Sequence, residues 1–116
     1  LLIGTNDVNA TLGPGQLRHY RRLRKMASTE VPTPEAYRAN LAQLLRRLRT
    51  ETPARIAVLS LPPMSEDLTH EANRRANQYS QLLQEVAEAE GATYLPLRER
   101  LTELLQQRPS QPRVRF

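Results

Sequence analysis

Two short polar segments hold the residues whose types and spacing could do chemistry. Residues 4–9 begin Gly-Thr-Asn-Asp and directly follow the apolar residues 1–3, Leu-Leu-Ile. Residues 61–67 contain a Pro-Pro pair and end a second apolar run that starts at residue 56. In open parallel sheets, ligands bind outside the carboxyl ends of the strands. If both apolar runs are strands of one such sheet, these two segments form a candidate binding site.

The composition excludes several other kinds of site. The 116-residue chain has no cysteine, which excludes disulfides, thiolate chemistry and zinc–thiolate sites. The two histidines, His19 and His70, lie far apart in the sequence, so we predict no histidine-rich metal site. The chain also lacks a Gly-x-Ser-x-Gly turn, a phosphate-binding glycine loop and a His-Glu-x-x-His motif.

The elements that must position the two segments follow from hydrophobic periodicity. A helix is predicted from residue 34, because Thr33 is a suitable N-cap, Pro34 suits the first turn and an apolar stripe follows. That stripe consists of Tyr37, Leu41, Leu44, Leu45 and Leu48, and the last turn holds Arg46, Arg47 and Arg49. Residues 55–61 form a non-alternating apolar run, which is typical of a strand covered on both faces.

The remaining segments continue this alternation. A long helix is predicted at residues 69–90, ended by Gly91, and it is followed by a short strand at 93–95 and a helix at 97–107. We predict a basic helix at residues 16–26, loops at residues 8–15 and 27–32, and the end of a buried strand at residues 1–3. The whole order predicts a layered α/β fold with a parallel sheet and right-handed crossovers.

The Gly-x-Asn-Asp block, placed directly after an apolar strand end, resembles the third conserved block of the SGNH (GDSL-type) hydrolases. Residues 34–41, 56–63 and 92–97 are similar to the helix, the strand with its Pro-bearing loop, and the last strand that follow this block in that family. The resemblance implies a three-layer α/β/α, flavodoxin-like parallel sheet that is present only in part. It also implies an esterase, lipase or deacylase with no metal or organic cofactor.

Carried over residue by residue, the resemblance assigns Asn6 as a donor to the oxyanion hole. Gly4 would keep the turn tight and Asp7 would support the loop by hydrogen bonding. The loop at Pro62, Pro63, Met64 and Ser65 could touch substrate. The competing interpretation is that Asn6 and Asp7 only cap a strand-to-helix turn.

Several residues that the family needs are absent from the chain. The Gly-Asp-Ser nucleophile motif and the Asp-x-x-His motif with its family context are not found, since Asp67-Leu68-Thr69-His70 follows the Pro-Pro loop. We therefore expect residues 1–107 to form a partial domain, from the third conserved block onward. Residues 108–116 would be a linker toward a missing C-terminal segment. The complete protein would be a serine hydrolase of a small-molecule, carbohydrate or lipid ester, and this chain alone would be inactive.

The charge leaves two alternatives open. The net charge is +5, from 17 basic and 12 acidic residues, and Lys25 is the single lysine. A basic module that binds nucleic acid through residues 16–26 is one alternative, although a solvated helix face explains the same arginines. A non-catalytic scaffold of the same fold is the other. No apolar run approaches the roughly 18–20 residues of a membrane span, and neither a compartment nor an oligomeric state is predicted.

Overall fold

The computed structural model describes residues 1–15, 18, 22 and 33–108. Its elements are helix α1 (Thr5–Ala10), helix α3 (Pro34–Glu51), strand β1 (Ala57–Leu59), helix α4 (Glu71–Ala89), strand β2 (Thr93–Leu95) and helix α5 (Leu97–Gln107). This order confirms the predicted α/β fold class. Apart from residues 18 and 22, which are helical, the helix predicted at residues 16–26, with His19, and the loop at 27–32 lie outside the described residues.

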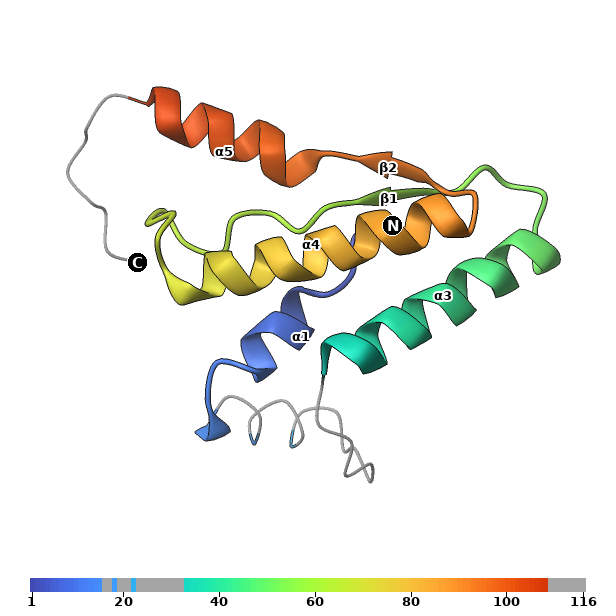
Figure 1. The fold of residues 1–116 in the computed structure, drawn as a ribbon, viewed down its shortest axis with the longest axis horizontal. Coiled ribbons are helices and arrows are strands. Elements are labelled where there is room, and N and C mark those ends of the chain that lie inside the picture. The colour runs from blue at the N-terminus through green and yellow to red at the C-terminus, as the bar shows by residue number, and fades with distance from the viewer. Residues whose placement is uncertain (16–17, 19–21, 23–32, 109–116) are drawn as a thin grey trace.

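The two strands pair in parallel, with Val58 opposite Tyr94. Leu1 adds a third parallel position on the other edge of β1, since its amino group donates to the Ala57 carbonyl (2.8 Å) and its carbonyl accepts from the Leu59 N–H (2.9 Å). Helices α3 and α4 pack against each other and α4 also packs on β2. Helix α5 lies on the opposite side of the strands from α3 (Figure 1).

Residues 1–3 were predicted to be the end of a buried strand, and the prediction that they are buried is wrong. The side chains of Leu1, Leu2 and Ile3 are 42%, 51% and 39% exposed. The pairing with β1 covers one edge of this segment, and no described residue pairs with its other edge. The strand predicted at 55–61 is also shorter, although Ile56 and Ser60 still bond to β2 on either side of it.

The core lies between the strands and the helices α1, α3 and α4. It contains the predicted stripe residues Tyr37, Leu41 and Leu45, and most of the predicted apolar face of α4. The predicted cap of α3 is present, because Thr33 Oγ1 accepts from the Ala36 N–H at 3.0 Å. Gly91 follows α4 at a φ of 73°, a left-handed conformation that favours glycine.

The loop predicted at residues 8–15 is wrong in its first part, because α1 extends to Ala10, and at residues 14–15, which are helical. Helix α1 has six residues, which is less than two helical turns. A segment this short does not repeat the helical spacing of apolar residues often enough to be recognised in the sequence. Val8 is nevertheless fully buried and places α1 in the core. The described helices include none that is both long and apolar enough to cross a bilayer.

Candidate functional site

Gly4 forms the junction between the Leu1 edge and α1. Its φ is 125°, and its carbonyl accepts the first helical bond, from the Val8 N–H at 3.0 Å. A Cβ on this residue would lie 3.0 Å from Cε2 and Oη of Tyr37 and 3.2 Å from Cδ2 of Leu61. Both the backbone conformation and the available space therefore require glycine here.

Asn6 and Asp7 occupy the first turn of α1. The N-cap is Gly4, which has no side chain, so neither Asn6 nor Asp7 is the N-cap residue of this helix. The Asn6 side chain is exposed, and Asp7 is half-buried. Asp7 also places a negative charge where the helix dipole is positive.

A hollow of about 220 Å³ opens beside Asp7. Its wall is apolar on the side of Ile3, Leu41 and Leu44 and polar on the side of Asp7 and Asn40. The Tyr37 ring completes the lining. Burial raises the pKa of Tyr37, and the nearby Asp7 charge raises it further, so this phenol stays protonated and can donate.

The second predicted segment is attached to α4 by two buried polar side chains. Ser80 Oγ accepts from the Leu61 N–H (3.0 Å), and Asn73 Oδ1 accepts from the Met64 N–H (2.7 Å). The Asn73 amide then donates to the carbonyls of Ser65 (3.0 Å) and Asp67 (2.7 Å). This loop is half-buried, and every amide hydrogen-bonding group of Asn73 is used to hold it.

The two predicted segments meet where Leu61 lies against Gly4. The carboxyl ends of Leu1–Ile3 and of β1 are thus adjacent, as the prediction of a shared site requires. The anchors Asn73 and Ser80 were missed in the sequence, although a signal was present. Both are small polar residues on the otherwise apolar face of α4, and buried polar groups at such positions require partners.

A third polar cluster joins β1 to the start of α5. Ser60 Oγ accepts from the Arg98 N–H (2.7 Å) and donates to Glu99 (3.2 Å), whose other oxygen accepts from Tyr94 Oη (2.8 Å). Arg98 Nη2 donates to the Asn73 carbonyl at 2.7 Å, and burial lowers the pKa of this guanidinium. The Ser60 hydroxyl thus caps the start of α5. Because Ser60 is fully buried, this hydroxyl is not accessible as a nucleophile.

His70 has a structural contact. Its Nδ1 accepts from the Ala72 N–H at 3.0 Å, which makes His70 the N-cap of α4. The Ser65 hydroxyl accepts from the Asp67 N–H within its own loop. Among the described residues, no group of three or more His, Cys, Asp or Glu could hold a metal ion.

Comparison with known proteins identifies a matching family and a solved structure of similar fold. The family described as the GDSL-like Lipase/Acylhydrolase family matches residues 1–113. The crystal structure of LAE5, an alpha/beta hydrolase enzyme from the metagenome of Lake Arreo, Spain, has the same fold, with a TM-score of 0.66 and 23% sequence identity. The similarity covers 92% of this chain and 44% of that enzyme, so the chain spans less than half of its length. No curated protein matches.

The family match covers nearly the whole chain, including both loops at the carboxyl ends of the strands. The chain therefore belongs to the GDSL-like lipase/acylhydrolase family.

Proposed function

We propose that this chain supplies part of the oxyanion hole of a serine ester hydrolase, with the Asn6 side-chain amide as a donor. The observation that carries the proposal is the exposed position of Asn6 in the first turn of α1, directly after the Gly4 junction. Gly4 and Asp7 support the turn that presents it. Membership of a hydrolase family supports the assignment of the reaction class.

The chemistry requires a fixed, neutral donor at this place. Attack on an ester carbonyl moves negative charge onto the carbonyl oxygen, and a preorganised N–H donor stabilises that charge as it forms. An amide donates without gaining or losing a proton, so its contribution does not depend on pH. The loop Pro62, Pro63, Met64 and Ser65 would form a wall of the substrate site, and its attachment to Asn73 supports a fixed shape.

The nucleophile and the base belong, in this proposal, to sequence outside these 116 residues. The chain lacks the Gly-Asp-Ser motif and the Asp-x-x-His motif in its family context, Ser60 is fully buried, and His70 caps α4. The chain also covers only 44% of its hydrolase structural neighbour. Residues 1–107 would then contribute one part of the hydrolase domain, and residues 108–116 would lead toward the base. The substrate would be a small-molecule, carbohydrate or lipid ester, and no cofactor is needed.

The decisive experiment is Asn6→Ala in the complete enzyme that contains this chain, assayed with p-nitrophenyl acetate. Loss of one oxyanion donor lowers kcat about 100- to 1,000-fold. Asn77→Ala is the matched control, because Asn77 is an exposed asparagine on α4. Full kcat in Asn6→Ala would contradict the proposal.

A second experiment tests the location of the nucleophile. The 116-residue chain is treated with a fluorophosphonate probe, which labels activated serines. We expect no labelling, because Ser60 is buried and Ser65 hydrogen-bonds within its own loop. Covalent labelling would show that a serine of this chain is activated and that the proposed division of the catalytic groups is wrong.

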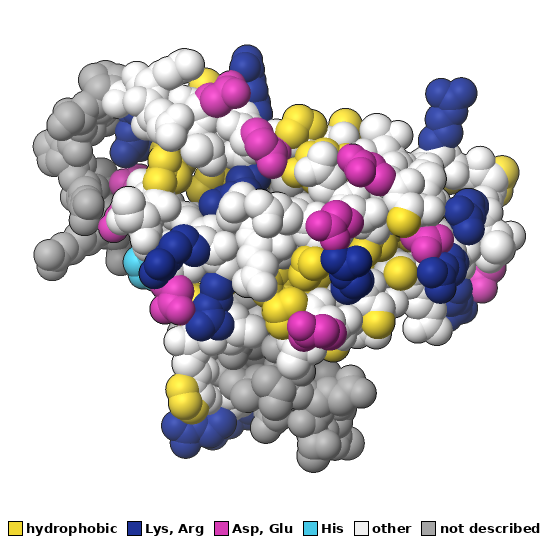
Figure 2. All heavy atoms as spheres, viewed as in Figure 1, with side chains coloured by type: hydrophobic (Ala, Val, Ile, Leu, Met, Phe, Trp, Pro, Cys, Tyr) yellow, Lys and Arg dark blue, Asp and Glu magenta, His cyan; other side chains and the backbone are white. Residues whose placement is uncertain are grey.

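The alternative of a nucleic-acid-binding module has less support. It depends on residues 16–26, most of which lie outside the described residues. On the face in Figure 2, arginine and acidic side chains are interspersed, and ion pairs join them within and between helices. A nucleic-acid-binding face gathers positive charge without such neutralisation.

A further inference from the structure

The short helix that carries Asn6 needs an external support. Six residues form one and a half turns, and isolated helices below about 12 residues are marginal in water. Asn6 itself is exposed, so its own contacts do not fix the direction of its amide. The position of α1 must therefore be set by the residues that hold its backbone.

The start of α1 is held by Tyr37 of α3. Its hydroxyl donates to the Ile3 carbonyl at 3.0 Å, one residue before Gly4. The Tyr37 ring packs at the point where a Gly4 side chain would lie, and it meets Tyr79 edge-on with ring centroids 4.9 Å apart. Because the ring is 6% exposed and packed on both sides, its hydroxyl has little freedom to move away from Ile3.

The end of α1 is held by Arg75 of α4. Arg75 Nη1 donates to the carbonyl of Thr11, the C-cap residue, at 2.6 Å. Arg75 Nη2 donates to Glu71 at 2.9 Å, which orients the guanidinium from its other side. A cation at the carboxyl end of a helix also interacts favourably with the helix dipole. The Thr11 hydroxyl closes the same turn by donating to the Val8 carbonyl at 2.7 Å.

Between the two ends, Val8 is fully buried in the core. Rotation of α1 about its axis would withdraw Val8 from that core, and translation along the axis would break the bond at Ile3 or at Thr11. The two donors come from positions 34 and 64 residues away in the sequence. Each donates to a main-chain carbonyl, so each acts on the helix as a whole.

From these contacts we propose that Tyr37 and Arg75 are positioning residues that clamp α1 at its two ends and so fix the helical turn that carries Asn6 before substrate binds. This inference rests on the proposed function of Asn6. Preorganisation is what gives an oxyanion donor its effect, and a displacement of about 1 Å in a reacting geometry can cost about 100-fold in rate. Neither positioning residue needs to touch the substrate.

The first test measures amide hydrogen exchange by NMR at Val8, Thr11 and Leu12, whose N–H groups bond within and just after α1. Tyr37→Phe keeps the ring and removes one neutral hydrogen bond, so exchange should become about 2- to 12-fold faster. Arg75→Gln removes a charged donor and should accelerate exchange about tenfold or more. Arg75→Lys keeps the charge and one donor, and should restore part of the protection.

Matched controls separate a local from a global effect. Arg74→Gln removes the same charge from the neighbouring, exposed position of α4, and Tyr94→Phe removes a phenol that bonds to Glu99. Neither should change exchange in α1. In the Tyr37 and Arg75 variants, the Ser60 and Thr93 amides, which bond between the strands, should keep their protection. A general loss of stability would accelerate exchange at all of these amides and would overturn the proposal.

The second test measures kcat and KM in the complete enzyme. Tyr37→Phe and Arg75→Gln should lower kcat about 10- to 100-fold with little change in KM, because a displaced donor weakens transition-state stabilisation. In an Asn6→Ala background, the same substitutions should have almost no further effect. Full additivity would show that the two residues act independently of Asn6 and would contradict the clamp.

The outcomes also separate this inference from the proposed function. Unchanged exchange in α1 for both variants would overturn the clamp, even if Asn6→Ala lowers kcat as expected. Faster exchange in α1 together with full kcat in Asn6→Ala would support the clamp on the helix and would instead overturn the oxyanion role of Asn6.

Discussion

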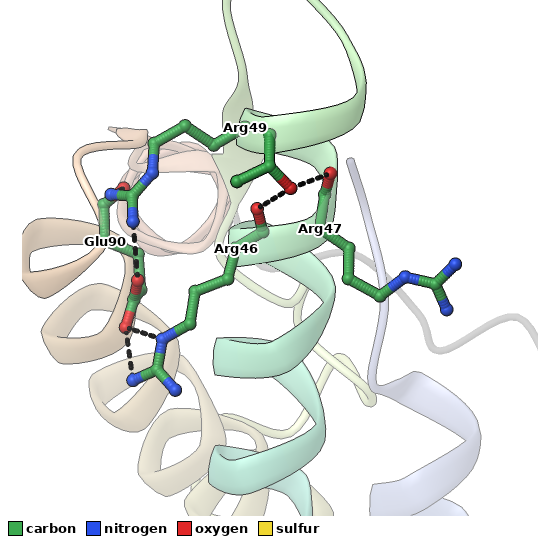
Figure 3. A network of polar contacts seen from close by, with 5 residues as sticks. Arg46, Arg47, Arg49 and Glu90 are labelled. Atoms are coloured by element: carbon green, nitrogen blue, oxygen red, sulfur yellow. Dashed lines mark hydrogen bonds and ion pairs between the residues drawn. The ribbon is translucent and has the colours of Figure 1, made fainter.

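The two ends of the sheet are held together by different kinds of polar contact. At the carboxyl ends of the strands, buried neutral side chains such as Asn73 and Ser80 bond directly to loop backbone. At the amino ends, the carboxylate of Glu90 forms ion pairs with two arginines of α3, Arg46 and Arg49. Figure 3 shows both arginines reaching across to Glu90, with Arg47 pointing away from it.

The amino-end contacts are ion pairs with one partner in water. Arg46 Nη2 lies 2.8 Å from Glu90 Oε1, and Arg49 Nη2 lies 3.6 Å from Glu90 Oε2. Arg49 Nη1 also donates to the main-chain carbonyl of Glu90 at 2.9 Å. The side chain of Glu90 is 9% exposed, whereas those of Arg46 and Arg49 are 63% and 55% exposed. These arginines therefore do more than complement the dipole of their own helix, because they join the end of α3 to the last turn of α4.

This difference indicates a division of tasks. Buried hydrogen bonds between neutral groups depend little on salt, and they fix backbone to a narrow range of positions. Ion pairs whose arginines lie mostly in water are partly screened by salt and contribute less to stability than their number suggests. The end of the sheet that needs a defined geometry has the first kind of contact, together with main-chain bonds from the guanidinium groups of Arg75 and Arg98. At the other end, the contacts of Glu90 are ion pairs that join two helices.

The largest expected effect is that of Gly4→Ala at the carboxyl end. The left-handed φ and the 3.0 Å approach of Tyr37 both oppose a Cβ, so we expect a loss of about 2–5 kcal/mol in the free energy of unfolding. Urea denaturation followed by circular dichroism measures it. Gly13→Ala is the control, because nothing lies within 4 Å of a Cβ at that position. Equal stability of the two variants would show that the Gly4 junction is not a constrained point.

Asn73→Ala should have the next largest effect. It leaves the Met64 N–H and the carbonyls of Ser65 and Asp67 without their bonds, and the half-buried loop can replace these only in part with water. We expect a loss of about 2–3 kcal/mol in the same denaturation experiment. Asn77→Ala, on the exposed side of α4, should be nearly neutral. If Asn73→Ala changed the free energy of unfolding only slightly, the carboxyl end of the sheet would not be held more firmly than the amino end.

Local signals in the sequence were sufficient for the longer elements. Thr33 and Pro34 marked the start of α3, Gly91 marked the end of α4, and the apolar run around Val58 marked β1. These predictions succeeded because caps, turns and periodicity act over a few neighbouring residues. Helix α4 begins two residues later than predicted, since His70 acts as its N-cap.

The contacts that shape the candidate site could not be predicted in this way. The stripe identified Tyr37 as a core residue, but its hydroxyl bonds to Ile3, 34 positions earlier. No pattern in the sequence singled out Arg75, which bonds to Thr11, 64 positions away. Helix α1 was missed because its stability comes from these distant partners rather than from its own six residues.

The pH dependence of stability should reflect the burial of Tyr37. Its pKa is raised in the folded state, so the phenol ionises more easily in the unfolded chain, near pH 10. The associated stability is present below that pH and is lost as the pH rises above it. Between pH 9 and 11, the free energy of unfolding of the unsubstituted protein should fall by about 1 kcal/mol more than that of the Tyr37→Phe variant. Urea midpoints measured at several pH values test this, and parallel pH profiles of the two proteins would contradict it.

The smallest effect is expected at the amino end, for Glu90→Gln. Glutamine keeps the shape and one acceptor oxygen for Arg46 but removes the charge, so the loss should be at most about 1 kcal/mol. Because Arg46 and Arg49 lie mostly in water, 1 M NaCl should reduce the difference in the free energy of unfolding between the unsubstituted protein and the Glu90→Gln variant. Glu85→Gln, which removes the exposed partner of Arg38, gives the reference for a surface ion pair. A loss above that of Asn73→Ala, unchanged by salt, would mean that the amino end is fixed as firmly as the end that carries Asn6.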